Sequence, residues 1–477
     1  MILFGTGGVR GIMRKGEFDE NLVMIVSQAV ATWMHEEGLN SVVIAYDTRK
    51  NSDVFAKLAA KTFADSGIDA FIFEEPVPTP LLSFAVREMN AGVGVVITAS
   101  HNPPEYNGYK VYTSDGVQAV PRYTEKIASM IGKSCHTGRI GTVNPVPEEI
   151  KEKYIEGLIE LVGGYVDSPE KIVYSPLQGT GARFVPMVLR RLGFEVFCVE
   201  NQMGFDPNFS KVSSLNPEYD EAFDDVKKLC RKENVRFGIA TDPDCDRVGL
   251  VVDGRKLTGN QVGVLLTQLL RHRAPRGSCL IKTIVTTDMV VPMCEEMGLR
   301  VFETPTGFKY IGHLIENELR ELNLDYFFAF EESCGYLTGH LVRDKDGVLG
   351  SALIAALCSK HDPLELLKSL YETYGYHGEK LVSIPFESVT HASKKYEELK
   401  LHPPQKLAGY PVINVHDYEN DPKMPNETLL IELDGVKIYV RPSGTEPKLK
   451  IYIKVVGSSE EEIESRLCSI ERVVRQI

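Results

Sequence analysis

The sequence predicts an α/β protein, because apolar runs typical of buried strands alternate with amphipathic helical patterns along most of its 477 residues. The first repeat of this order is clear: residues 41–46 form a β-branched run, 53–66 have helical periodicity, and 69–73 form the next apolar run. The order returns twice, in 171–174, 183–192, 195–199, 278–281, a helical run from Met289, and 300–302. Three similar α/β units in series are therefore expected.

The pattern changes after about Tyr376, where short strands dominate. Leu433-Asp434-Gly435-Val436 is typical of a two-residue hairpin turn. The expected elements are strands at 429–433, 436–440 and 450–455 and a helix from Ser459. We expect a smaller α+β domain here, and the chain length suits two to four domains.

Bulk composition excludes several classes of function. The apolar fraction of 43% and the charged fraction of 25% are those of a globular protein. A net charge of -13 argues against nucleic acid or an anionic membrane as partner. The nine cysteines contain no CxxC pair, which indicates free thiols in a reducing compartment. With no apparent signal peptide or membrane span, we expect a cytoplasmic protein.

The apolar run Val95–Ile97 ends abruptly in Thr98-Ala99-Ser100-His101-Asn102-Pro103-Pro104. This places the Ser100 hydroxyl at a strand end, where α/β proteins bind ligands, and the prolines stiffen the loop. Taken alone, the segment suits an ordinary turn equally well. Because neighbouring side chains on an extended segment point apart, Ser100 and His101 are not expected to form a hydrolase dyad. No GxSxG turn surrounds the serine.

Three aspartates at alternating positions follow the apolar strand 237–240. Asp242, Asp244 and Asp246 would repel one another unless a cation neutralised them, and Mg²⁺ prefers oxygen ligands of this kind. An EF-hand needs glycine where this chain has Arg247, and it needs helices where strands are expected. We therefore expect one Mg²⁺ per chain, with a solvated acidic turn as the alternative.

A third polar loop spans residues 439–448. Arg441 offers a planar donor fork, Ser443 and Thr445 add hydroxyl groups, and Gly444 lets main-chain N–H groups approach an anion. These residue types suit a phosphate clamp, although generic polar turns also contain them.

Adjacent glutamates after the apolar run 328–330 are unusual, because like charges at a strand end need hydrogen-bonding partners. Sugar hydroxyls would supply partners to Glu331 and Glu332, with a solvent-facing acidic loop as the alternative. Arg10, Lys110 and Lys309 lie in or just after glycine-containing turns, and each lysine taken alone could be a surface charge.

Together these elements resemble the α-D-phosphohexomutase superfamily over essentially the whole chain. The motifs occur in the family's order: FGTGGVRG, TASHNPPEYNGYK, DPDCDR, EESCGY and RPSGTEPK. The elements TPTGFKYIG and EESCGY…VRDKDGV are most similar to the phosphoglucomutase/phosphomannomutase branch. Phe330 stands where relatives often have glycine, and Tyr336 where some phosphomannomutases have histidine.

The resemblance implies a heart-shaped molecule of three related α/β domains with mixed sheets and a smaller C-terminal α+β domain similar to TATA-box-binding proteins. The implied domains are 1–140 with the phosphoserine loop, 141–252 with the metal loop, 253–372 with the sugar loop, and 373–477 with the phosphate loop.

The implied activity is interconversion of hexose 1-phosphate and hexose 6-phosphate through a phosphoserine enzyme and a hexose 1,6-bisphosphate, which also acts as activator. The partners are small sugar phosphates, with no role for nucleic acid or membrane. The implied metal ligands are Ser100, Asp242, Asp244 and Asp246. The implied catalytic residues are Ser100, His101, Lys110, Arg10 and Arg247. The implied substrate-binding residues are Lys309, Glu331, Ser333, Arg441, Ser443, Gly444 and Thr445.

Several alternatives stay open at this level. Glucose and mannose differ at one hydroxyl, which a loop of Glu331 and Ser333 need not distinguish. Phosphopentomutase activity is possible, and Gly7 and Glu332 count against a phosphoglucosamine mutase. A phosphatase is a further alternative, because a phosphoserine open to water would lose its phosphoryl group. A catalytically silent sugar-phosphate-binding protein would need the clamp but not Ser100 or the aspartates.

Overall fold

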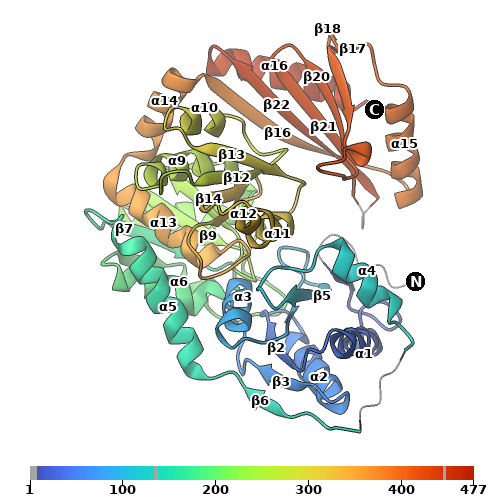
Figure 1. Cartoon of the computed structure of the whole chain (residues 1–477). Coiled ribbons are helices and arrows are strands. Elements are labelled where there is room, and N and C mark those ends of the chain that lie inside the picture. The colour runs from blue at the N-terminus through green and yellow to red at the C-terminus, as the bar shows by residue number, and fades with distance from the viewer. Residues whose placement is uncertain (1–7, 134–137, 444–446, 477) are drawn as a thin grey trace. The chain divides into compact units, whose positions relative to one another are not determined.

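The computed structural model describes residues 8–133, 138–443 and 447–476. Its contacts divide the chain into two compact units. The first unit contains residues 1–279 and 307–363, and the second contains 280–306 and 364–477. Strands and helices alternate along most of the chain (Figure 1), which confirms the predicted α/β class.

The first sheet of the first unit is mixed, with six strands in the order β1-β5-β4-β2-β3-β6. The strands β4, β2, β3 and β6 run parallel, whereas β5 is antiparallel to both β4 and β1. The strands are β1 (Val9–Ile12), β2 (Ser41–Tyr46), β3 (Asp69–Ile72), β4 (Val93–Ile97), β5 (Tyr106–Thr113) and β6 (Val143–Pro145). The accompanying helices are α1 (Glu20–Glu36), α2 (Ser52–Asp65), α3 (Thr79–Glu88) and α4 (Pro121–Ser129).

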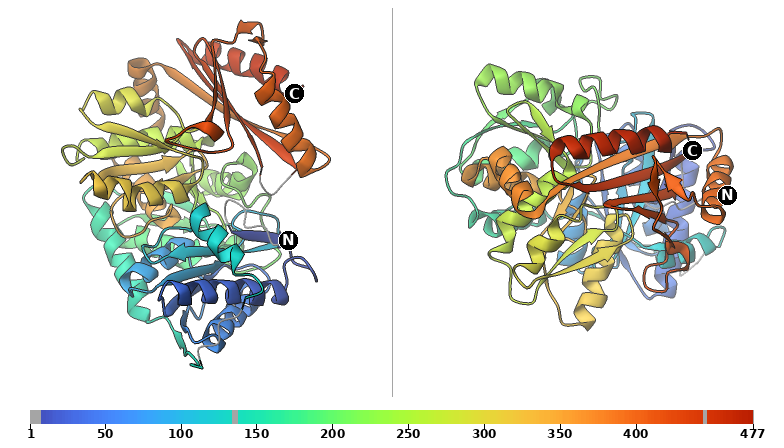
Figure 2. Two further views of the ribbon diagram at one scale, coloured as in Figure 1. Left: turned by 45° about the vertical axis from the view of Figure 1, so that its right-hand side comes forward. Right: turned by 90° about the horizontal axis from the view of Figure 1, so that it is seen from above.

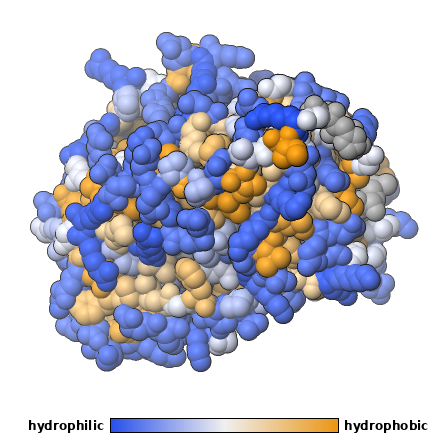
Figure 3. Space-filling model, turned by 90° about the horizontal axis from the view of Figure 1, so that it is seen from below, coloured by the Kyte–Doolittle hydropathy of each residue, from blue (hydrophilic) through white to orange (hydrophobic). Residues whose placement is uncertain are grey.

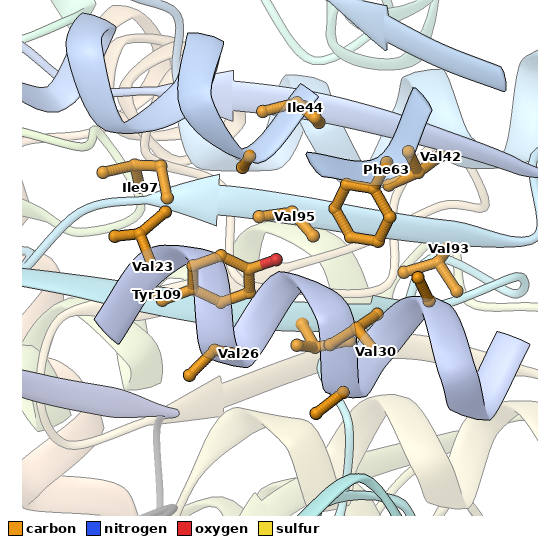
Figure 4. Packing of buried hydrophobic residues seen from close by; sticks show 14 of the residues in the cluster. Val23, Val26, Val30, Val42, Ile44, Phe63, Val93, Val95, Ile97 and Tyr109 are labelled. Carbon is orange, nitrogen blue, oxygen red and sulfur yellow. The ribbon is translucent and has the colours of Figure 1, made fainter. Parts of the chain in front are cut away.

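The core of this sheet lies beneath α1 and α2. Every second residue of β4 points to that face, so Val95 and Ile97 meet Val23, Val26 and Val30 of α1 (Figure 4). All five side chains are buried. Burial of this kind, at about 25 cal/mol per Å² of apolar surface, holds the strands in register and fixes where each strand ends.

The rest of the first unit contains a second mixed sheet, in the order β11-β10-β9-β7-β8, and a short antiparallel pair β14–β15. The strands are β7 (Lys171–Ser175), β8 (Glu195–Cys198), β9 (Phe237–Thr241), β10 (Val248–Val252), β11 (Arg255–Leu257), β14 (Tyr326–Glu331) and β15 (Gly335–Leu337). The helices are α5 (Glu148–Gly163), α6 (Gly181–Arg191), α7 (Glu200–Met203), α8 (Asp224–Glu233), α9 (Gly259–Arg271), α11 (Phe308–Glu316), α12 (Glu318–Glu321) and α13 (Gly347–Lys360), with a 3-10 turn at Asp220–Phe223.

Three loops of the first unit share one construction, because each joins two antiparallel neighbours of a sheet. The serine loop (residues 98–105) joins β4 to β5, the metal loop (242–247) joins β9 to β10, and the sugar loop (332–334) joins β14 to β15. A short connection between paired strands is fixed at both ends by the ladder, so these loops can hold side chains in defined positions.

The second unit contains a five-stranded antiparallel sheet in the order β16-β22-β21-β20-β19. Its helices α15 and α16 cover one face, and α16 lies along the orange and red strands in Figure 2. Leu433 pairs with Val436, which confirms the predicted hairpin. The elements are β12 (Cys279–Thr283, in this unit from 280), α10 (Val290–Glu295), β13 (Arg300–Thr304), α14 (Pro363–Tyr374, in this unit from 364), β16 (Tyr376–Pro385), α15 (Val389–Leu401), β17 (Lys406–Leu407), β18 (Tyr410–Pro411), β19 (Asn414–Asp417), a 3-10 turn (Tyr418–Asn420), β20 (Leu429–Leu433), β21 (Val436–Pro442), β22 (Lys448–Gly457) and α16 (Glu460–Val474).

The described cysteines all carry free thiols, as the sequence predicts. Most of them are buried, whereas Cys468 is exposed. Hydrophilic side chains predominate on the face of the molecule shown in Figure 3, with apolar residues in separate groups among them. Among the described helices, none has the length and apolar character needed to cross a membrane.

Candidate active site

Ser100 and the aspartates of the metal loop meet in the first unit. The Ser100 Oγ donates a hydrogen bond of 2.9 Å to Asp242 Oδ2, although 142 residues separate the two in sequence. Ser100 is 2% exposed and Asp242 is fully buried. The structure therefore brings together the two sequence elements that carried the strongest functional prediction.

The main chain at Ser100 adopts the left-handed conformation, with φ +53°. Residues other than glycine rarely adopt this conformation, and at a functional site it indicates that the surroundings hold the residue there. The Ser100 amide donates to Thr98 Oγ1 at 2.8 Å. In this conformation the hydroxyl donates to Asp242 of the metal loop.

His101 differs from the sequence-based expectation. Its Nδ1 lies 3.4 Å from Ser100 Oγ, so the two side chains do not point apart. The premise of an extended segment is wrong, because the positive φ of Ser100 turns the chain between them, whereas the absence of a hydrolase dyad stays a prediction. At this distance the contact is weak, and the shorter hydrogen bond of Ser100 goes to Asp242.

The three aspartates of the metal loop form a tight cluster. One carboxylate oxygen from each of Asp242, Asp244 and Asp246 lies within 4.8 Å of the others, and all three residues are buried. The loop is held closed by the amides of Asp246 and Arg247, which donate to Asp242 Oδ1 at 3.1 and 3.0 Å. Cys245, which lies between Asp244 and Asp246, has a left-handed main-chain conformation, with φ +52°.

Two lysines balance part of this negative charge. Lys110, on β5, places its Nζ 3.1 Å from Asp244 Oδ2 and 3.7 Å from Asp246 Oδ2. Lys345 places its Nζ 3.0 Å from Asp246 Oδ2 and 3.6 Å from Asp344 Oδ1. The side chains of both lysines are at most 10% exposed, so these ion pairs are poorly screened by water.

The protonation of the cluster follows from burial and these partners. Burial raises the pKa of Asp242 well above its usual range, and the charges of Asp246 and Asp244 raise it further. Burial acts on Asp244 in the same direction, but the ammonium groups of Lys110 and Lys345 outweigh it and lower the pKa of Asp244. Burial would also lower the pKa of Lys345, yet the neighbouring carboxylates hold it above its usual value.

The donor set of the cluster fits a hard divalent cation. Asp244 Oδ1 and Asp246 Oδ1 are buried and accept no hydrogen bond from any described residue. Buried carboxylate oxygens without donors are costly unless a cation takes them as ligands. Three clustered carboxylates, two of which offer such oxygens, with no nitrogen or sulfur ligand among them, suit Mg²⁺.

Of the two predicted arginines, Arg247 borders this cluster and Arg10 contacts the serine loop. Arg247 Nη1 donates to Glu218 Oε1, and its Nε lies 3.8 Å from Asp246 Oδ1. Arg10, on β1, donates from Nη1 to Asn102 Oδ1 of the serine loop at 3.1 Å. The pKa of Arg247 is raised, because Glu218 and the neighbouring carboxylates outweigh the effect of burial.

The sugar loop approaches the same cluster from the end of β14. Glu331 is 4% exposed, and burial raises its pKa against the opposing charges of Lys345 and Arg247. Ser333 is half-buried and hydrogen-bonds to Glu331. Lys309, the second residue of α11, is also buried, and its Nζ lies 5.1 Å from the ring centroid of Tyr310. The sugar-binding role of these residues stays a prediction.

The predicted phosphate loop lies in the second unit, at the end of β21. Arg441 pairs in register with Lys450 of β22, and the amide of Ser443 donates to the carbonyl of Lys448 at 2.9 Å. Both Arg441 and Ser443 are half-buried. Gly444 and Thr445 lie outside the described residues, as does Gly7 of the N-terminal motif.

Sequence reasoning missed three residues that contact this site. Lys345 lies in the VRDKDGV element, which carried a resemblance but no role. Glu218 pairs with Arg247, and Arg49 donates to the serine loop. The sequence did offer an indication of Arg49, because Asp47-Thr48-Arg49 follows directly after a buried strand. Charged residues at such a position are rarely buried without an oppositely charged partner.

Comparison with known proteins places this geometry in a family. Models described as phosphoglucomutase/phosphomannomutase, alpha/beta/alpha domains I, II and III, match residues 1–136, 152–255 and 258–374. A phosphoglucomutase from Staphylococcus aureus (strain MRSA252) is 34% identical over 506 residues, which cover 95% of this chain and 89% of the relative.

Solved structures extend the comparison. A crystal structure from Thermus thermophilus, assigned to a phosphomannomutase, is 25% identical with a TM-score of 0.80, and covers 100% of this chain and 98% of that chain. An N-acetylphosphoglucosamine mutase from Aspergillus fumigatus, in complex with glucose 1,6-bisphosphate, is 13% identical with a TM-score of 0.54, and covers 100% of this chain and 95% of that chain. The second likeness shows the fold alone.

Three α/β/α domains, a further sheet-rich C-terminal domain, and a serine bonded to an acidic triad define an enzyme of the phosphohexomutase class. The predicted resemblance is confirmed. The chain belongs to the phosphoglucomutase/phosphomannomutase family.

Proposed function

We propose that this enzyme interconverts hexose 1-phosphate and hexose 6-phosphate of glucose, mannose or both. A phosphoryl group on Ser100 passes to the free hydroxyl of the substrate, giving a hexose 1,6-bisphosphate. This intermediate turns end for end, and Ser100 then recovers the other phosphoryl group. The observation that carries the proposal is the 2.9 Å hydrogen bond from Ser100 Oγ to a carboxylate of the buried triad.

The charges around Ser100 support transfer of a phosphoryl group. Lys110 and Arg247 border the triad, and cations positioned near a transferring phosphoryl group stabilise the charge on its oxygens. Lys110 and His101 are the proposed groups for moving a proton at the reacting hydroxyl. Arg10, bonded to Asn102, is proposed to contact phosphate oxygens beside Ser100.

We further propose that Asp242, Asp244, Asp246 and the phosphorylated Ser100 hold Mg²⁺. When bound, the cation supplies neutralisation of the phosphoryl charge that would otherwise repel an anionic sugar phosphate. The unbonded oxygens of Asp244 and Asp246 support this assignment. The proposed domain ranges are 1–140, 141–252, 253–372 and 373–477.

Substrate is proposed to bind through Glu331 and Ser333, which read sugar hydroxyls, and through Lys309. The clamp of Arg441, Ser443, Gly444 and Thr445 is proposed to hold the phosphate that is not being transferred. Hexose 1,6-bisphosphate serves as activator by phosphorylating Ser100. The Aspergillus fumigatus relative binds this same compound, which supports the proposal.

The test is Ser100→Ala in a coupled assay with Mg²⁺ and a trace of bisphosphate, run on glucose, mannose, glucosamine and pentose 1-phosphates. The variant should lose all transfer and all phosphoprotein signal while it folds normally. Ser27→Ala is the matched control. Ser27 is a buried serine of α1, which packs on the same sheet, and its Oγ lies 3.1 Å from the hydroxyl oxygen of Tyr109 in a hydrogen bond. Turnover by S100A near the parental rate would contradict the proposal.

The same assay separates a mutase from a phosphatase. A mutase forms the isomeric sugar phosphate without releasing inorganic phosphate, whereas a phosphatase releases phosphate at each turnover. The near-complete burial of Ser100 favours the mutase, because water must be excluded from a phosphoserine that is to be kept. The sugar that gives the highest kcat/KM identifies the physiological class of substrate.

A further inference from the structure

Four main-chain carbonyls in and next to the serine loop accept hydrogen bonds from one buried guanidinium group, that of Arg49. Its Nη1 donates to the carbonyls of Pro103 at 2.8 Å and Tyr106 at 3.2 Å. Its Nη2 donates to the carbonyls of Ser100 and Asn102. Buried carbonyls need donors, so a single side chain meets the hydrogen-bonding demand of much of this loop.

Arg49 is in turn held from its other sides. Its Nε lies 3.2 Å from Asp47 Oδ2, and both side chains are completely buried. Asp47 Oδ1 accepts from Ser52 Oγ at 2.7 Å. The Phe209 ring covers the guanidinium with its centroid 5.2 Å away, a cation–π contact. Burial raises the pKa of Asp47, and the charge of Arg49 opposes that rise.

The Ser100 main chain needs this support because its left-handed conformation is disfavoured. Its amide donates to Thr98 Oγ1, and its carbonyl accepts from Arg49. Both polar groups of the main chain are thereby fixed by side chains. The fixed main chain leaves the Oγ directed at Asp242.

We propose that Arg49 is a positioning residue for phosphoryl transfer, which sets the direction of the Ser100 Oγ by holding the serine-loop carbonyls. The inference rests on the proposed function, in which Ser100 carries the phosphoryl group. A planar guanidinium can reach four carbonyls and Asp47 at once. A lysine keeps the charge and the pairing with Asp47, but its single ammonium group cannot reach the whole set.

Arg49→Lys therefore separates geometry from charge. We expect kcat to fall about 10- to 100-fold, since misplacing a reacting group by about 1 Å has effects of this size. KM for the sugar phosphate should stay within about twofold, because Arg49 is buried and its side chain donates to main-chain carbonyls in and next to the loop. Phosphorylation of Ser100 by hexose 1,6-bisphosphate, followed by intact-protein mass spectrometry, should slow by the same factor as kcat.

Arg87→Lys is the matched control. Arg87 also donates to a carbonyl, that of Asp115 at 2.7 Å, and pairs with a buried carboxylate, Glu316 at 3.2 Å, without touching the serine loop. Its kcat should stay at the parental value. A folded R49K enzyme with parental kcat, or with a raised KM alone, would overturn the inference.

If R49K does not fold, the Thr98→Val variant tests the inference in its place. This variant removes the acceptor of the Ser100 amide and the Thr98 hydrogen bond to Asp47, the partner of Arg49, and keeps the buried volume. A kcat about tenfold lower at unchanged KM supports side-chain control of the Ser100 geometry, and a parental kcat overturns it. Parental enzyme without phosphoserine, or an active S100A, would instead defeat the proposed function itself, so the two failures are distinguishable.

Discussion

Lys345→Met tests whether the lysines are a structural part of the carboxylate cluster. Methionine keeps the length and the apolar stem of the side chain but removes the ammonium group, which lies 3.0 Å from Asp246 Oδ2. At an effective dielectric constant of about 20, two charges at this distance attract by about 5 kcal/mol. Removal of the ammonium group leaves the buried Asp246 carboxylate with only its longer contacts to Lys110 and Arg247, so we expect the free energy of unfolding to fall by about 3–5 kcal/mol.

The measurement is urea unfolding followed by tryptophan fluorescence in the presence of EDTA. Trp33 is the only tryptophan of the chain, and it is buried in α1 of the first unit, which also contains the cluster. The control is Lys153→Met, which breaks an ion pair of 2.7 Å with Glu88 whose side chains are 51% and 36% exposed. An exposed pair of this kind contributes at most about 1 kcal/mol.

Saturating Mg²⁺ provides the second arm of this experiment. A bound cation replaces the positive charge that K345M removes, so the deficit of the variant should shrink relative to that in EDTA. Mg²⁺ at 100 times its Kd stabilises a protein by about 2.7 kcal/mol, which is enough to be resolved. The reasoning is refuted if K345M in EDTA costs no more than K153M.

Three other outcomes are expected. Burial raises the pKa of Asp346 to about 6 from 3.8, so its ionisation should lower the free energy of unfolding by about 3 kcal/mol as pH rises from about 4 to about 6. Asp346→Asn keeps the cap of α13 and the Tyr154 contact and should flatten this fall, as measured by urea unfolding at several pH values. EDTA should abolish mutase activity and Mg²⁺ restore it, whereas Asp244→Asn should need at least about tenfold more Mg²⁺ for half-activity. In Gly259→Ala, a Cβ would lie 2.1 Å from the Glu332 carbonyl, so the sugar loop must shift and KM for the sugar phosphate should rise more than kcat falls; an unchanged KM would contradict this.

Hydrophobic pattern alone determined the class of fold and the positions of several elements. The helix expected over 53–66 spans Ser52–Asp65, and the strand expected over 237–240 spans Phe237–Thr241. The expected helix from Met289 begins at Val290 and is short, ending at Glu295. These elements can be predicted from the sequence because local periodicity and burial on one face specify them without reference to distant residues.

The chemical identity of the site was also legible in part. Asp242, Asp244 and Asp246 lie within one short loop, so their crowding and their affinity for a hard cation follow from spacing. The proximity of Ser100 to this loop followed from the family resemblance and not from the residue pattern itself, because the two lie in different sheets and 142 residues apart. Only the packing of the two hairpins against each other decides that distance.

The sequence by itself determined the α/β class and predicted a serine loop, a metal loop and a sugar loop, since each of these is a local pattern of a few residues. The tertiary structure decided which distant charges meet them: Lys345 on the carboxylates, Glu218 on Arg247, and Arg49 on the carbonyls around Ser100. It also decided the left-handed turn that brings His101 beside Ser100. The physical reason is that a buried charge or carbonyl requires a hydrogen-bonding or charged partner, but several kinds of side chain can fill that role. The partner is set by tertiary packing, and the local sequence does not specify it.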